Sequence, residues 1–261
     1  MNRFILIREY LSYYLSAKTK HGIHSPFVFE FVTKVLNKRF KDGQTKKIEK
    51  LRKELSASSR MIKKCDFGVG SESGSSGSQS VKDIIKNSAK SKKYAGLLCR
   101  IIRHFNFKKA LELGTSAGIS SMYMATAMPM GKVITIEGNP EIAKLSVENF
   151  DKVGITNITQ VTSNFDEVLD GILAKEKLFD IIFFDGNHRE EATIRYFNQC
   201  LSCIHNETVF VFDDINWSDG MKQAWLKIKQ HPSVKVSIDL FFLGIVFFRR
   251  ELSKEDFVVR F

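Results

Sequence analysis

Cysteine is scarce in this sequence, with only four among 261 residues. Four cysteines in a chain of this length do not build a disulfide framework, and unpaired thiols are typical of a reducing compartment such as the cytoplasm. Cys200 and Cys203 form a CxxC pair, but the sequence has no second pair to complete a metal site. Because free cysteine usually behaves as a small hydrophobic residue, we interpret this pair as core positions one helical turn apart.

Long hydrophobic runs are also missing. The longest apolar stretch, residues 240–248, is much shorter than the roughly 20 residues that a helix needs to cross a bilayer. Near the N-terminus, a short apolar run is followed at once by Arg8 and Glu9, so it does not form the core of a secretory signal. We therefore expect a cytoplasmic protein with no membrane span.

Acidic residues are few in the first part of the chain. Residues 1–109 hold 25 basic and 8 acidic side chains, whereas residues 110–261 hold 15 and 21, within a net charge of +11. A basic N-terminal part favours an acidic substrate, a nucleic acid or a membrane surface. A solvated, lysine-rich helical face would leave the same pattern, so the charge alone does not choose between these partners.

From residue 107 onward, β-rich runs alternate with stretches of helical spacing. Apolar runs without polar alternation indicate strands that are buried on both faces, and short connections through helices indicate a parallel sheet. Asn139 and Pro140 mark one helix start, as a capping residue followed by proline in the first turn. The β-rich runs are 108–113, 132–137, 157–162, 179–185, 208–214, 234–240 and 243–250; the helical stretches are 117–128, 140–152, 165–175, 189–203 and 217–230.

The last two β-rich runs have almost nothing between them, so one must lie antiparallel to its neighbour. Residues 1–106 have mainly helical spacing, with a flexible Gly/Ser-rich segment at 68–80 and a capping box at Ser80. The predicted fold is α/β: a Rossmann-like, doubly wound, seven-stranded sheet, mostly parallel with the last strand antiparallel. We expect two parts, a basic and mainly helical N-terminal extension at 1–106 and a cofactor-binding domain at 107–261.

Two glycine-rich segments have the composition of nucleotide-binding loops. CDFGVGS (65–71) is followed by a Ser/Gly run and a lysine-rich helix, with no strand that ends in an acid. LELGTSAGIS (111–120) lies between a strand and a helix, and the next strand ends in Glu137. Only the second segment therefore has the context of a nucleotide site, in which the acid binds the ribose hydroxyls.

The residues of the second segment suit that task. Gly114 and Gly118 lack a Cβ atom, which permits a sharp turn and a close approach of a ligand. Glu137 offers two oxygens to a ribose diol. Glu112 stands at the loop entrance, where its carboxylate can accept hydrogen bonds from the amino group of a cofactor. The alternative is that both glycines serve only the packing of helix on strand, and that Glu137 is an ordinary acid at a strand end.

Residues 108–250 resemble class I methyltransferases, and most of all the small-molecule O-methyltransferases of the catechol type and their bacterial relatives. The resemblance is carried by LELGTSAGISS, VITIEGNP, FFDGNH and VFVFDDI together, and by the order of elements. It implies S-adenosyl-L-methionine as the cofactor. It places Glu112, Gly114, Ser116 and Gly118 at the methionine end, Glu137 at the ribose, Asn164 and Phe165 beside the adenine, and Asp185 near the sulfonium and the metal. The family often has a glycine pair before the fifth strand, where we expect Asn206 to take the same left-handed turn.

Methyl transfer also requires a place where the acceptor loses its proton. Asp185, Asp213 and Asp214 end the fourth and fifth strands, which we expect to be neighbours, so their carboxylates would converge. Such a cluster suits Mg²⁺, which lowers the pKa of a bound hydroxyl. His188 holds the place of the lysine base of catechol-type enzymes, and a neutral histidine can do the same work. The alternative is that the aspartates cap a helix and His188 bonds them at a helix start.

We thus predict an S-adenosylmethionine-dependent methyltransferase that methylates an oxygen of a small molecule, an acidic one in view of the basic extension, with the help of a divalent metal. One alternative is an RNA or protein methyltransferase that docks through the basic part. A NAD-dependent oxidoreductase is another, although GTSAG keeps only the outer glycines of GxGxxG. A non-catalytic cofactor-binding module is the last. A homodimer and a nucleic-acid partner both remain open.

Overall fold

The computed structural model describes residues 3–38, 43, 45–63 and 77–261. The chain forms two compact units, one made of Met1–Lys38 with Leu173–Phe261 and the other of Arg39–Ile172. The glycine-rich segment at 65–71 lies outside the described residues, as does the predicted flexible segment at 68–80 up to residue 76. A boundary between an N-terminal extension and a cofactor-binding domain at residue 106 stays a prediction.

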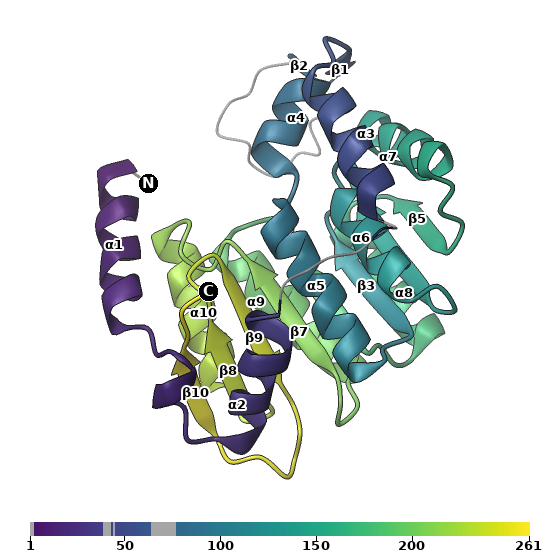
Figure 1. Cartoon of the computed structure of the whole chain (residues 1–261). Coiled ribbons are helices and arrows are strands. Elements are labelled where there is room, and N and C mark those ends of the chain that lie inside the picture. The colour runs from purple at the N-terminus through teal and green to yellow at the C-terminus, as the bar shows by residue number, and fades with distance from the viewer. Residues whose placement is uncertain (1–2, 39–42, 44, 64–76) are drawn as a thin grey trace. The chain divides into compact units, whose positions relative to one another are not determined.

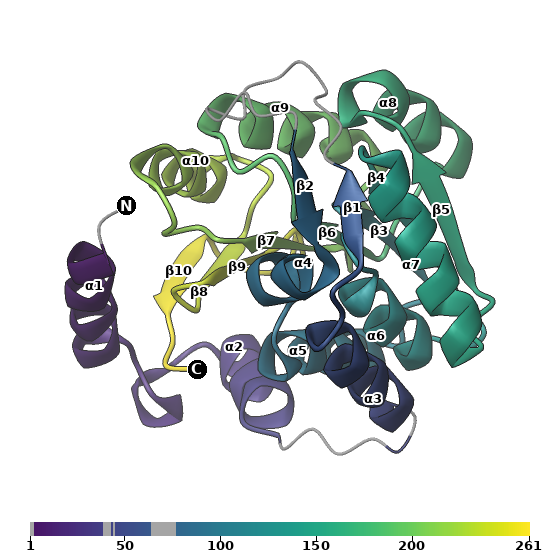
Figure 2. The ribbon, with the colours of Figure 1, turned by 90° about the horizontal axis from the view of Figure 1, so that it is seen from above.

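The unit Arg39–Ile172 is built on three parallel strands in the order β3 (Lys109–Leu113), β4 (Lys132–Glu137) and β5 (Ile158–Thr162). Helices α6 (Ile119–Ala127) and α7 (Pro140–Val153) connect these strands. Figure 2 shows α6 and α7 on one side of the strands and α8 (Phe165–Glu176) on the other. The predicted strand–helix alternation is confirmed here, and α7 begins at the predicted Asn139 cap, whose Oδ1 accepts from the N–H of Glu141 at 2.9 Å.

Three further helices belong to this unit: α3 (Thr45–Ser56), α4 (Val81–Ser88) and α5 (Lys92–Phe105). The predicted cap is present, because Ser80 Oγ accepts from the N–H of Asp83 at 3.1 Å. Ile48 and Leu51 are buried in one cluster with Tyr123 and Phe150, so the α3 face packs against the α6 and α7 helices. Two short antiparallel strands, β1 (Met61–Lys63) and β2 (Ser78–Ser80), were not predicted.

The other unit contains the remaining five strands of the chain's described part. They are ordered β10-β8-β9-β7-β6 and span β6 (Ile181–Phe184), β7 (Val209–Asp213), β8 (Val236–Asp239), β9 (Leu243–Phe247) and β10 (Glu255–Val258). β9 lies antiparallel to both β7 and β8, which confirms the reversed strand expected at 243–250. β10 adds an eighth strand beside β8. Sequence patterning missed it because this short edge strand buries only Phe257.

Helices cover the strands of this unit from two sides (Figures 1 and 2). α9 (Glu190–Cys200) and α10 (Asp219–Gln230) pack together, and α2 (Pro26–Phe31) places Phe27 and Phe31 edge-on to the ring of Phe247, at centroid distances of 5.0 and 5.2 Å. Three single turns complete the unit: η1 (Lys20–Gly22), η2 (Val32–Leu36) and η3 (Leu201–Cys203). Cys200 and Cys203 are buried free thiols, as expected.

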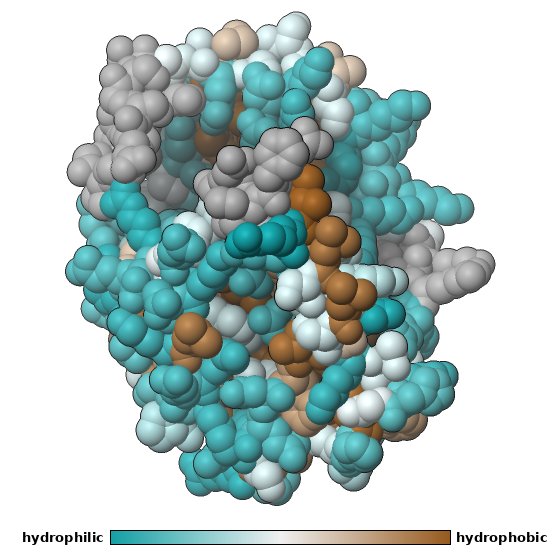
Figure 3. All heavy atoms as spheres, turned by 90° about the vertical axis from the view of Figure 1, so that its left-hand side faces the viewer, coloured by the Kyte–Doolittle hydropathy of each residue, from teal (hydrophilic) through white to brown (hydrophobic). Residues whose placement is uncertain are grey.

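Helix α1 (Arg3–Ser16) has apolar side chains on a buried face and on a neighbouring exposed face. Its inner face rests on the same unit, where the Tyr13 hydroxyl donates to the carbonyl of Val259 at 2.5 Å and Tyr13 clusters with Phe241. Figure 3 faces the side of the molecule on which α1 lies and shows a run of hydrophobic side chains down the surface. The exposed large residues of α1 are Ile7, Leu11, Tyr14 and Leu15. Among the described residues, no helix combines the length and hydropathy needed to cross a membrane.

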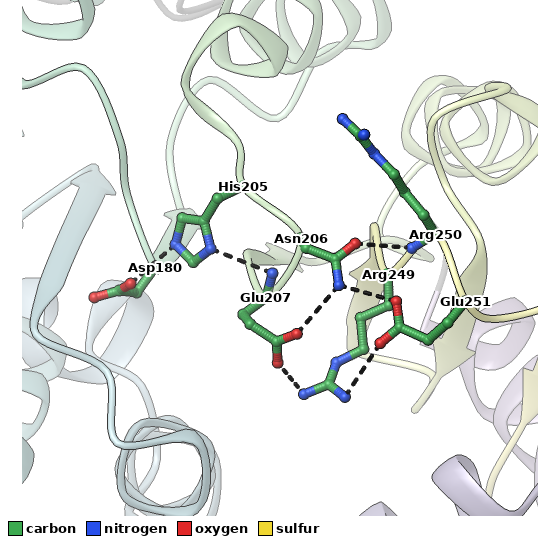
Figure 4. A network of polar contacts seen from close by, with 7 residues as sticks. All are labelled: Asp180, His205, Asn206, Glu207, Arg249, Arg250 and Glu251. Atoms are coloured by element: carbon green, nitrogen blue, oxygen red, sulfur yellow. Dashed lines mark hydrogen bonds and ion pairs between the residues drawn. The ribbon is translucent and has the colours of Figure 1, made fainter.

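A polar network joins the start of β6 and β7 to the segment after β9 (Figure 4). His205 Nε2 lies 2.9 Å from Asp180 Oδ1, and Asn206 accepts a hydrogen bond from the N–H of Arg250 at 2.9 Å. The expectation that Asn206 takes a left-handed turn is wrong, since it is not among the residues with positive φ. Its side chain stabilises the connection instead, by bonding the segment that follows β9.

Candidate functional site

The loop after β3 makes a tight left-handed turn. Gly114, Ser116 and Gly118 all have positive φ, at 106°, 49° and 79°. The N–H groups of Gly114 and Thr115 both donate to the carbonyl of Ile136, at 3.0 and 3.2 Å, which ties the loop to the neighbouring strand β4. Glycine adopts such backbone angles without steric cost, so two of the three positions are explained by conformation alone.

Glu137 contacts this loop directly. One carboxylate oxygen accepts from the N–H of Ser116 at 2.8 Å, and the other accepts from the N–H of Asn139 at 3.0 Å. Burial raises the pKa of Glu137, while these backbone hydrogen bonds act in the opposite direction. Each carboxylate oxygen retains a further lone pair, so the acid can still accept from a ligand hydroxyl. The structure thus brings the predicted ribose-binding acid and the glycine turn to one rim of the parallel strands.

Gly118 has a packing role as well. A Cβ atom at this position would lie 2.3 Å from the ring of Phe150, a contact that no side chain can make. Gly118 also stands at the N-terminal cap of α6, so its missing side chain lets α6 approach α7. Gly118 is therefore needed both for the packing of α6 against α7 and for the left-handed turn.

Glu112 lies deeper than the sequence suggested. Its side chain is fully buried, and one oxygen accepts hydrogen bonds from the hydroxyls of Ser121 and Thr135, the latter at 2.6 Å. The other oxygen has no hydrogen-bond partner. Burial raises the pKa of Glu112 to about 7, against the lowering effect of the hydroxyl groups of Ser120, Ser121 and Thr135. We expected Glu112 at the loop entrance, but it lies beneath the loop, where it contacts Ser121 and Thr135.

Asn164 and Phe165 follow β5 at the same rim. The N–H of Ser163 donates to the carbonyl of Glu137 at 3.1 Å, which links this segment to the acid. Asn164 Oδ1 accepts from the N–H of Asp166 at 3.2 Å, and Phe165 begins α8. Both residues are partly exposed.

Ser121 and Thr135 are the two positions that sequence reasoning missed in this region. The register of β3 and β4 sets Thr135 directly beside Glu112. Thr135 Oγ1 also lies 2.6 Å from Thr115 Oγ1, so one buried hydroxyl connects the acid with the loop. The available signal was a lone polar residue inside the apolar run VITIE.

In the unit Leu173–Phe261, three predicted residues come together. Asp185, His188 and Asp213 offer ligand atoms that all lie within 4.8 Å of one another. The pairing of β6 with β7 explains the meeting of the two acids, because Phe184 lies beside Phe212 and each acid is the next residue. Asp213 is buried, whereas His188 keeps 30% of its side chain exposed. The group is therefore reachable from solvent on the histidine side.

Asp214 lies outside this group, contrary to the expected set of three aspartates. β7 ends at Asp213, so Asp214 is the first residue of the turn that follows the strand. The backbone of Asp214 is left-handed, with φ of 54°, and its carbonyl accepts from the N–H of Trp217 at 2.9 Å. Asp214 is thus part of the turn that follows β7. His188 is the third residue of the group with Asp185 and Asp213.

Parallel strands, a glycine turn after the first of them and an acid after the second define a Rossmann-like α/β protein with a nucleotide-type site. A family model described as O-methyltransferase matches residues 76–238. The chain belongs to this O-methyltransferase family.

Individual relatives agree with this assignment. The catechol O-methyltransferase of Niastella koreensis is 33% identical over 111 residues, covering 41% of this chain and 49% of that protein. The catechol O-methyltransferase of Mycobacterium tuberculosis is 27% identical over 127 residues, covering 48% and 56%. The chain therefore spans about half the length of the curated relatives it matches.

The fold is also that of solved methyltransferases. The structure of an O-methyltransferase from Bacillus cereus in complex with SAH superposes with a TM-score of 0.57 and 18% identity, over 85% of this chain and 97% of that one. At this identity the likeness establishes the fold: a mostly parallel sheet with helices, as predicted.

Proposed function

We propose that this chain is an S-adenosylmethionine-dependent methyltransferase that methylates an oxygen atom of a small molecule. The observation that carries the proposal is the 2.8 Å hydrogen bond from the N–H of Ser116 to Glu137 in a chain of the O-methyltransferase family. It joins a left-handed glycine turn to a strand-end acid, the pair that a nucleoside-type cofactor needs.

The residues of this rim suit the cofactor. Ser116 Oγ is buried without a hydrogen-bond partner, so it is a donor and acceptor available to a polar ligand. Glu137 would accept from the ribose hydroxyls, Gly114 and Ser116 would border the methionine end, and Asn164 with Phe165 would border the adenine. When bound, S-adenosyl-L-methionine supplies an electrophilic methyl group on a sulfonium.

His188 and Asp185 are the residues proposed to act on the acceptor. Oxygen methylation forms a bond between the acceptor oxygen and the methyl carbon, breaks the bond from that carbon to sulfur, and releases the hydroxyl proton. The ligand atoms of Asp185, His188 and Asp213 lie within 4.8 Å of one another. Together these side chains would accept that proton and bind a cation. A divalent metal there supplies positive charge that lowers the pKa of a hydroxyl. The sequence favoured Mg²⁺ for this place.

The remaining partners are part of the same proposal. A cytoplasmic location is supported by the free thiols of Cys99, Cys200 and Cys203. A homodimer is supported by the exposed apolar face of α1. Methylation of RNA or protein through the basic part stays an alternative prediction, whereas membership in the O-methyltransferase family gives a NAD-dependent oxidoreductase no support.

Isothermal titration of the full chain with S-adenosylmethionine and with NAD, each with and without Mg²⁺, tests the proposal. We expect binding of S-adenosylmethionine alone. Absence of both a binding heat and a thermal shift with S-adenosylmethionine would remove the basis of the assignment.

Glu137→Ala tests the rim itself. Loss of the carboxylate removes the proposed ribose contact, so we expect the affinity for S-adenosylmethionine to fall by at least about tenfold, a loss of ~1.4 kcal/mol. Glu141→Ala is the matched control, because it removes an exposed carboxylate from the neighbouring first turn of α7. Equal affinities of the two variants and the wild type would take Glu137 out of the site. Circular dichroism shows whether each variant is folded.

A further inference from the structure

The group formed by Asp185, His188 and Asp213 differs in composition from the all-oxygen cluster that the sequence suggested. The group consists of two carboxylates and one imidazole ring, and the ligand atoms of the three side chains lie within 4.8 Å of one another. The two acids come from the adjacent ends of β6 and β7, and His188 comes from the segment between β6 and α9. Two different structural segments thus supply the three ligand atoms.

The spacing within the group suits a shared ion better than a direct bond. His188 Nε2 lies 4.0 Å from Asp185 Oδ1. A hydrogen bond between such atoms would require about 2.7–3.2 Å. Two atoms that bind one metal ion, each at about 2.0–2.2 Å, are separated by up to about 4.4 Å. The observed separation is therefore in the range that an ion between the ring and the carboxylate would give.

The ligand types decide which ion. Mg²⁺ takes oxygen ligands in near-ideal octahedral geometry and keeps several waters, whereas imidazole suits transition metals such as Zn²⁺, Fe²⁺ and Ni²⁺. One nitrogen and two carboxylates favour the latter class, and 30% of the His188 side chain is exposed to solvent. Asp214, which would have completed an oxygen-only set, is outside the group.

We propose that His188 is a metal ligand and that Asp185, His188 and Asp213 bind a divalent transition metal in preference to Mg²⁺. This inference rests on the proposed function, which it deepens: His188 acts on the acceptor through the ion it binds rather than by taking the hydroxyl proton itself. The preference for a transition metal follows from the nitrogen ligand, so a variant without the His188 imidazole should lose that preference.

The test is metal binding by the full chain without a substrate. Competition titrations with MnCl₂ and MgCl₂ should give at least about tenfold tighter binding of Mn²⁺. Pulsed electron paramagnetic resonance of the bound Mn²⁺ should show modulation from a directly coordinated nitrogen. His188→Ala should abolish that modulation and weaken Mn²⁺ binding by at least about tenfold, and His188→Asp should restore binding while removing the preference over Mg²⁺.

Two variants serve as controls. His205→Ala removes a histidine that pairs with Asp180 elsewhere in the same unit, and it should leave both the affinity and the nitrogen signal unchanged. Asp214→Asn should also leave them unchanged. Equal affinities for the two metals, a nitrogen signal that survives His188→Ala, or loss of binding in Asp214→Asn would each overturn the proposal.

The outcome is separable from that of the proposed function. Binding of S-adenosylmethionine is measured on the same preparation and depends on residues near Glu137. Normal cofactor binding with no nitrogen-coordinated Mn²⁺ would overturn the metal assignment and leave the methyltransferase assignment standing. Nitrogen-coordinated Mn²⁺ without cofactor binding would support the metal site and count against the methyltransferase.

Discussion

Glu112 is a carboxylate without solvent exposure beneath the loop after β3. It is fully buried, it receives hydrogen bonds from the hydroxyls of Ser121 and Thr135, and one of its oxygens has no partner. An ionised carboxylate is costly in such surroundings, so the protonated form is favoured and the pKa rises to about 7. Glu112 thus lowers the stability of the folded chain at neutral pH while it is linked through Thr135 to the loop after β3.

This environment predicts that Glu112→Gln raises the free energy of unfolding by an amount that depends on pH. The unfolded chain loses the proton near its ordinary pKa of 4.5 and the folded chain near 7, so the acid's ionisation penalises folding increasingly between these values. Relative to the wild type, the free energy of unfolding of the variant should rise across that window and level off above it, by at most about 3 kcal/mol.

Urea unfolding of both proteins at pH 5, 6, 7 and 8 measures the difference. A gap between the two proteins that stays constant over this range would contradict the assigned cause. The sequence placed Glu112 in the site, but its hydroxyl donors depend on strand register, which LELGTSAG alone does not specify.

At the scale of elements, the meeting of α6 and α7 depends on Gly118. Its φ of 79° is in the left-handed region, and a Cβ atom would lie 2.3 Å from the Phe150 ring. We expect Gly118→Ala to lower the free energy of unfolding by about 2–4 kcal/mol, because strain and overpacking add. The affinity for S-adenosylmethionine should fall as well, since the same residue shapes the cofactor loop.

A double-mutant cycle with Phe150→Ala separates the two causes. If the clash dominates, the double variant loses less stability than the two single variants together, with a coupling of about 0.5–3 kcal/mol. Additive losses would show that backbone strain, and not contact with Phe150, makes the glycine necessary. Thermal and urea unfolding of the three variants provide the energies.

At the scale of the whole molecule, α1 predicts association. A helix with apolar side chains on more than one face is normally buried on each of them, yet Leu11 and Leu15 are 55% and 81% exposed. The exposed pattern is self-complementary about Leu11: a two-fold axis there pairs Ile7 with Leu15 and Arg8 with Tyr14. An isologous contact of this kind gives a closed dimer of the chain.

Light scattering on a sizing column tests this association. We expect a dimer for the wild type at tens of micromolar and a monomer for Leu11→Asp, since a buried charge at the axis would meet its own copy. Val147→Asp changes another exposed apolar residue, on α7, and should remain dimeric. A wild-type monomer at every concentration would exclude the contact.

The sequence by itself determined the order of strands and helices from residue 107 to 250, the glycine turn and the acid of the rim, because alternation, capping and buried apolar runs are local properties of the chain. The register of β3 with β4, the left-handed turn at Asp214 and the arrival of His188 beside Asp185 and Asp213 were decided only by the tertiary structure. These features depend on which residues packing and strand pairing bring side by side, and that information lies in no single segment.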